Sequence, residues 1–220
     1  MPTPKHPLSR IVPLLFIALL LTSCSTAYYS AMEKVGVHKR DILVDRVEEA
    51  RDAQEEAQEE FKSALEQFAS VVALKETDLK VAYDKLNAEY LDCEQASDKV
   101  SNQIDKVDKV SEDLFEEWED ELELYENQTY RATSKRQLRE TKSRYRDMLS
   151  SMRVAERSMV PVLQTFEDNA LFLKHNLNAQ AIGSLQAEFD GLEKDIDLLI
   201  KRMNEAIKES NAFIAQMEQS

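Results

Sequence analysis

The chain has few of the residues that interrupt regular structure. Its 220 residues include three glycines, five prolines and two cysteines, and Pro161 is the only proline after Pro13. So few chain breakers argue against a β-rich or loop-rich fold. The residues that are abundant instead, such as Ala, Glu, Leu, Lys and Gln, are strong helix formers. The composition therefore predicts long helices.

The first 23 residues have the pattern of an export signal. Lys5 and Arg10 precede an apolar run over residues 11–21, which is interrupted only by Pro13. A helix of this length spans about 17 Å, whereas a membrane-crossing helix needs roughly 20 residues. A short apolar run behind a basic start indicates a signal peptide, not a transmembrane segment.

The apolar run ends in Leu21, Thr22, Ser23 and Cys24. These residues resemble the lipobox of bacterial lipoproteins. The resemblance implies a diacylglycerol on Cys24, cleavage before this residue, and acylation of the new amino group with a fatty acid such as palmitate. Several acyl chains make a durable membrane anchor. Ser25, where some sorted lipoproteins carry Asp, favours the periplasmic face of the outer membrane, with the outer leaflet of the inner membrane as the alternative.

The net charge is −14, and removal of a leader that contains Lys5 and Arg10 makes the rest still more acidic. Proteins that bind nucleic acid present a basic face, so we expect no nucleic-acid partner. An anionic lipid surface would also repel the chain. We expect residues 24–38 to be a short tether and residues 39–216 to be the helical domain.

Apolar residues recur at 3–4 spacing in four stretches, which is the pattern of helices that pack along a seam. The seams run from Val47 to Val71, from Leu79 to Tyr125, from Leu138 to Leu173 and from Ile182 to Phe213. Polar breaks separate them, with Thr77, Asp78 and Asn178 as candidate caps. The sequence predicts helices at about 39–74, 78–126, 134–175 and 179–216. Pro161 should kink the third helix, or split it with Ser158 as a cap.

Two charge blocks flank the central break. Residues 112–126 hold nine acids and no base, and residues 131–146 hold seven bases and one acid. Opposite charges would steer antiparallel pairing of the second and third helices. We therefore expect an all-α, antiparallel up-down four-helix bundle with short loops. The alternative is one long coiled-coil hairpin, in which the other two breaks are stutters.

A search for reactive groups predicts no enzyme and no cofactor. Di-metal bundles use Glu-x-x-His pairs, but Val35 and Phe172 precede His38 and His175 at that spacing. Three glycines form no phosphate-binding loop. With Cys24 modified, Cys93 has no disulfide partner, and its place on a seam predicts a buried core residue.

Two segments, YYSAMEKVGVHKRDILVDRVEEARDAQ and FLKHNLNAQAIGSLQ, resemble an uncharacterised family of proteobacterial lipoproteins, which is defined only as a domain of unknown function. The resemblance covers nearly the whole chain after the leader. It implies a helical envelope protein and offers no mechanism.

The sequence favours a non-enzymatic, membrane-anchored lipoprotein that binds an unidentified protein partner or acts as a spacer in the envelope. Small residues on the first seam, Ala50, Ala57 and Ala64, could also serve a homo-oligomer. The alternative is a bundle that binds a small molecule or lipid between its helices. The aromatic and methionine side chains that could line such a cavity are Tyr83, Tyr90, Trp118, Met148, Met152 and Phe166.

Overall fold

The computed structural model describes residues 38–73, 79–176 and 179–219. These residues form four α-helices and no strand: α3 (Lys39–Val72), α4 (Leu79–Leu122), α5 (Gln128–His175) and α6 (Ala179–Gln219). The predicted four-helix bundle is therefore confirmed, and the alternative of a single long hairpin is wrong. The export signal, the lipobox residues, Cys24 and all of the tether except His38 lie outside the described residues, as do the candidate caps Thr77, Asp78 and Asn178.

The chain divides into two compact units, residues 1–42 and residues 43–220. In the first unit the structure describes the beginning of α3. Asp41 accepts a hydrogen bond from the backbone N–H of His38 at 3.2 Å, and the N–H of Asp41 donates to the His38 carbonyl at 3.0 Å. A carboxylate that returns to the N-cap residue is one half of a capping box. His38 and Asp41 thus cap the beginning of α3.

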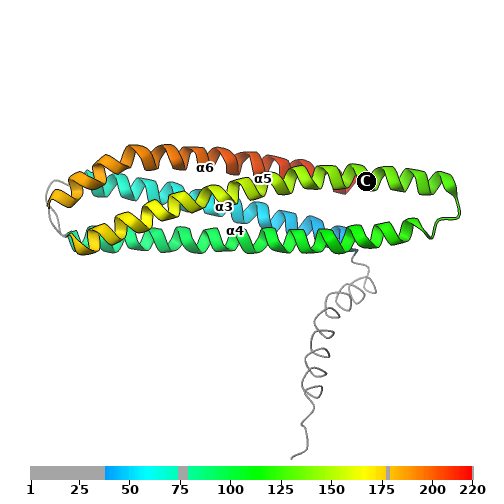
Figure 1. Cartoon of the computed structure of the whole chain (residues 1–220), viewed down its shortest axis with the longest axis horizontal. Helices are drawn as coiled ribbons and strands as arrows, with labels where there is room; N and C mark the ends of the chain where they lie inside the picture. The colour runs from blue at the N-terminus through cyan, green and yellow to red at the C-terminus, as the bar shows by residue number, and fades with distance from the viewer. Residues whose placement is uncertain (1–37, 74–78, 177–178, 220) are drawn as a thin grey trace, which may run out of the picture. The chain divides into compact units, whose positions relative to one another are not determined.

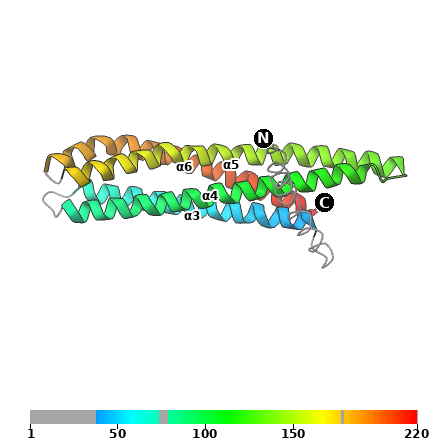
Figure 2. The same ribbon diagram turned by 60° about the horizontal axis from the view of Figure 1, so that its bottom comes forward.

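Within residues 43–220, consecutive helices run in opposite directions (Figures 1 and 2). Lys99 of α4 pairs with Glu56 of α3. The Gln58 side chain of α3 donates to Asn204 of α6 at 3.1 Å, so the last helix lies against the first. Side chains of α5 meet both α4 and α6. The arrangement is an up-down bundle in which short connections join antiparallel neighbours.

The predicted seams form the core of the bundle. Phe68 is fully buried; its ring meets Phe166 of α5 edge-on, with centroids 6.3 Å apart, and stacks on Phe189 of α6 at 6.0 Å. Three helices thus contribute to one aromatic cluster. A buried side chain of this size contributes about 1.5–3 kcal/mol to folding.

The hairpin of α4 and α5 extends beyond the other helices. The ring of Tyr145 on α5 lies 6.2 Å from that of Phe213 on α6. From this contact α6 continues for six residues to Gln219, whereas α5 extends 17 residues to Gln128. At 1.5 Å per residue, α5 reaches about 16 Å farther. Figures 1 and 2 both show the turn between α4 and α5 beyond the ends of α3 and α6. We call residues 116–138 the arm, and the described residues of 43–115 and 139–219 the body.

The turn at the end of the arm is shorter than the sequence predicts. α4 ends at Leu122 instead of about residue 126, and α5 begins at Gln128 instead of about residue 134. Asn127, predicted to lie in a polar break, caps α5: its side-chain oxygen accepts from Thr129 N at 2.9 Å and Tyr130 N at 3.3 Å. The carboxylates near the C-terminal end of α4 are repelled by the negative end of the helix dipole. This repulsion accounts for the end of α4 at Leu122.

Pro161 does not split α5, which is continuous from Gln128 to His175. The predicted cap at Ser158 is therefore wrong. This hydroxyl is buried and donates to the Ala155 carbonyl at 2.7 Å, a bond made inside a helix. Packing along the rest of α5 offsets the backbone hydrogen bond that proline removes.

Candidate functional site

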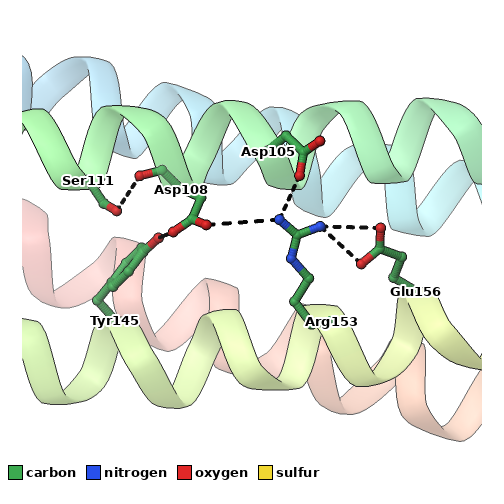
Figure 3. Close-up of polar contacts among 6 residues, drawn as sticks. All are labelled: Asp105, Asp108, Ser111, Tyr145, Arg153 and Glu156. Atoms are coloured by element: carbon green, nitrogen blue, oxygen red, sulfur yellow. Dashed lines mark hydrogen bonds and ion pairs between the residues drawn. The ribbon is translucent and has the colours of Figure 1, made fainter.

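A network of polar side chains joins α4 to α5 where the arm leaves the body (Figure 3). The Tyr145 hydroxyl donates to Asp108 at 2.8 Å. Ser111, one turn along α4, donates to the Asp108 carbonyl at 2.7 Å. Burial raises the pKa of Tyr145 above its ordinary value of 10.0, and the hydrogen bond to Asp108 raises it further. The hydroxyl therefore stays protonated and acts as a donor at neutral pH.

Arg153 extends this network by two turns along α5. Its guanidinium lies 2.6 Å from Asp105 and 4.0 Å from Asp108 on α4, and 3.1 Å from Glu156 on its own helix. Burial lowers the pKa of Arg153, but its hydrogen bonds to Asp105 and Glu156 outweigh this, and the net pKa is raised. One cation thus fixes the register of two helices.

A cleft of about 480 Å³ opens beside this network. Its residues come from one face of α4 and one face of α5, at helical spacing. They are Asp108, Ser111, Glu112, Phe115, Arg139, Lys142, Ser143, Tyr145 and Arg146. The Phe115 and Tyr145 rings meet edge to face, with centroids 5.4 Å apart. The Lys142 ammonium lies 5.4 Å from the Phe115 centroid. We call this the α4–α5 cleft.

The two charge blocks pair along the arm, as the sequence predicts. Glu119 of α4 lies 2.5 Å from Lys142 of α5, and Glu123 pairs with Arg131 nearer the turn. The Trp118 indole N–H donates to the Ser134 hydroxyl at 2.8 Å. Because most of these groups are exposed, each ion pair contributes only about 0–1 kcal/mol. Their joint effect is to select one antiparallel register.

The end of the arm also exposes large apolar side chains. Leu124 is 80% exposed and Tyr130 is 64% exposed, with Tyr125 between them in sequence. Residues of this kind occur elsewhere on the described surface at single positions along α4, α5 and α6, and as the adjacent pair Leu171 and Phe172 near the end of α5. Three within seven residues, at the end of a projecting hairpin, are typical of a contact surface.

Cys93 is fully buried, as its place on a seam predicts. Burial, together with the nearby carboxylates of Glu60 and Glu89, raises its pKa to about 12. The thiolate is the reactive form of cysteine, so this thiol is inert near neutral pH. Among the described residues, no three His, Cys, Asp or Glu side chains gather in an arrangement that could hold a metal ion.

Of the six residues predicted to line an internal cavity, three are buried and three are half-buried. Met148, Met152 and Phe166 are buried in the core. The Tyr90 hydroxyl donates to Glu94, which raises the pKa of Tyr90 to about 12. None of the six lines the α4–α5 cleft or the other two described clefts. Sequence reasoning missed the cleft because four of its five charged residues, Glu112, Arg139, Lys142 and Arg146, belong to the two charge blocks, which predict only helix pairing.

Comparison with known families finds one match. The model of the family described as "Protein of unknown function (DUF2959)" matches residues 28–217. The chain belongs to this family. The DUF2959 match covers the described helices except the last two residues of α6, so it includes the arm, the cleft and nearly all of the body. No curated protein and no solved structure matches the chain.

The described helices of this DUF2959 member are all too polar to span a bilayer. Each combines a buried stripe with a charged outer face, which is the pattern of helices that pack in a bundle. Ala50, Ala57 and Ala64 are completely buried within the single chain. Self-association therefore stays a prediction, and a contact between two copies of the chain would have to use other residues.

Proposed function

We propose that this chain is a non-enzymatic lipoprotein of the cell envelope, anchored through Cys24, which binds a protein partner or holds it at a set distance from the membrane. The arm is the observation that carries this proposal. It is a projecting element whose end exposes Leu124 and Tyr130. Exposed helical hairpins recognise other helices through apolar anchors of this kind.

The body supports the same proposal because buried side chains fill the space between its helices. Its buried positions are mostly alanines, aliphatic residues, methionines and phenylalanines, and Cys93 is held in its unreactive form. The body thus has the properties of a scaffold.

The anchor is tested by replacing the modified residue. Wild-type chain and Cys24→Ala are expressed in a bacterial host that is fed labelled palmitate. We expect label in the wild-type chain and in the membrane fraction, and no label in the variant. Equal labelling of the two proteins would exclude Cys24 as the lipid site.

The arm is tested by photocrosslinking in intact cells. A photoreactive amino acid is placed at Tyr130 in the arm or at Val160 in the body, two positions on α5 that are 64% and 63% exposed. We expect a specific crosslinked protein from position 130 and none from position 160. The same adducts from both positions would contradict a role for the arm. Their absence from both would contradict a protein partner at this surface.

A further inference from the structure

We propose that the α4–α5 cleft binds a small ligand in which an anionic group, a carboxylate or phosphate, is attached to an apolar, ring-sized body. This inference is independent of the protein partner proposed for the arm. It starts from the size of the cleft, about 480 Å³. Ligand sites commonly have volumes of 300–1,000 Å³.

The apolar wall of the cleft consists of the Phe115 and Tyr145 rings, which are packed edge to face and mostly covered. Their arrangement is fixed by neighbours on both sides. Tyr145 is bonded to Asp108, and its ring meets Phe213 of α6 behind it. A wall that is already ordered receives an apolar ligand group at little entropic cost.

The basic side of the cleft consists of Arg139, Lys142 and Arg146, at positions i, i+3 and i+7 of α5. Lys142 is paired with Glu119. Among the described residues, neither Arg139 nor Arg146 has an ion-pair partner; Arg146 donates only its Nε–H, to the Lys142 carbonyl at 3.2 Å. Both guanidiniums thus keep N–H groups that can donate to a carboxylate or phosphate.

The acids of the cleft leave this positive charge in excess. Asp108 already accepts from Tyr145 and lies 4.0 Å from Arg153, so Glu112 is the remaining opposing carboxylate. The other two described clefts differ. One is lined by Asp168 and Glu188 without a cation, and the smaller one is lined by a single cation, Arg144, together with Asp147 and Glu209. Of these three clefts, the α4–α5 cleft is the one in which several cations lie beside aromatic rings.

The first test uses the full chain in non-ionic detergent, with phenyl phosphate as the probe. Inorganic phosphate and phenol each supply one half of its chemistry. Trp118 is the only tryptophan and lies one turn from Phe115, so its emission reports binding alongside calorimetry. We expect phenyl phosphate to bind at least about tenfold more tightly than either half. Binding no tighter than that of phosphate or phenol would overturn the proposal.

The second test uses variants with opposite expected signs. Arg139→Gln and Arg146→Gln should each weaken the binding of phenyl phosphate about fivefold, and Glu112→Gln should strengthen it. Arg144→Gln, on the same helix but outside this cleft, is the matched control and should change nothing. Equal effects of Arg144→Gln and Arg146→Gln would show that binding depends only on the net charge of the protein, and would overturn the proposal. Thermal melting by circular dichroism checks that each variant is folded.

An anionic group attached to an apolar body occurs in soluble aromatic acids. It also occurs in anionic lipids, where the charged headgroup is joined to the first carbons of the acyl chains. Short-chain phosphatidylglycerol added to the micelles distinguishes these sources. If it displaces phenyl phosphate, the ligand is of the lipid class. If it does not, while phenyl phosphate still depends on Arg139 and Arg146, the ligand is a soluble aromatic acid.

Discussion

The body and the arm share two helices but are stabilised in different ways. In the body, Phe68 meets rings from two other helices and is fully buried. In the arm, only two helices face each other; they bury Leu122 and Leu138, and they are joined by the Trp118–Ser134 hydrogen bond and by exposed ion pairs such as Glu123–Arg131. Burial is worth more than exposed charge pairing. The body therefore supplies stability, whereas the arm uses charge to keep its register.

The largest expected difference comes from the same substitution made in both regions. Leu86 in the body is 1% exposed and Leu122 in the arm is 6% exposed, both on α4. Leu86→Ala should lower the free energy of unfolding by about 2–5 kcal/mol, because the surrounding helices cannot close the cavity. Leu122→Ala should lower it by less than about 2 kcal/mol, since the arm can open locally. Urea denaturation measures both, and equal losses would show that arm and body unfold as one unit.

A buried amide tests how far the body depends on apolar packing. Gln54 is completely buried, and neither of its side-chain polar atoms has a hydrogen-bond partner among the described residues. Gln54→Met should raise the free energy of unfolding by about 1–3 kcal/mol, because it removes an unsatisfied polar group at similar volume. Gln58→Met is the matched control on the same helix. It should destabilise the chain, because Gln58 bonds to Asn204.

The junction of the two regions should show a pH dependence. Tyr145→Phe removes the hydroxyl bonded to Asp108 and should cost about 1 kcal/mol at pH 7. The pKa of Tyr145 is raised in the folded chain, so above pH 10 the unfolded state loses this proton while the folded state keeps it. Stability should therefore fall as the pH rises from about 10, and fall less in the variant.

Urea denaturation between pH 7 and pH 11 measures this dependence. Tyr130→Phe, an exposed tyrosine on the same helix, is the control and should leave the profile unchanged. Burial also raises the pKa of Cys93 to about 12, which lowers stability in an overlapping range in every variant. The difference between the variants isolates Tyr145. Parallel wild-type and Tyr145→Phe profiles would contradict its protonated, buried role.

The smallest expected effect is that of one exposed pair in the arm. Arg131→Glu places like charges at Glu123 and should cost less than about 1 kcal/mol globally. It should speed hydrogen exchange in residues 116–138, and the exchanged pair Glu123→Arg with Arg131→Glu should restore protection. Salt should reduce the effect of the single variant. Unchanged exchange in the single variant would show that this pair does not hold the register.

The number of helices and the faces they bury could be predicted because each depends on local order in the chain. The 3–4 spacing from Val47 to Val71 places those side chains on one stripe wherever the helix packs, and Val47, Phe61 and Val71 are indeed buried. Residues 112–126 and 131–146 were likewise predicted to pair, because a short turn joins them. The start of α5 was less predictable, since Asn127 can lie in a loop or cap a helix.

The sequence by itself determined the all-α class, the core stripes and the pairing of α4 with α5, because these follow from the spacing of apolar and charged residues along one chain. Only the tertiary structure decided that α4 and α5 outreach their neighbours, that Tyr145 reaches Asp108, and that Arg139 and Arg146 flank aromatic rings across a cleft. These features depend on the relative axial positions of different helices. That offset is set by packing between side chains far apart in sequence, such as Tyr145 and Phe213, which no pattern within one helix contains.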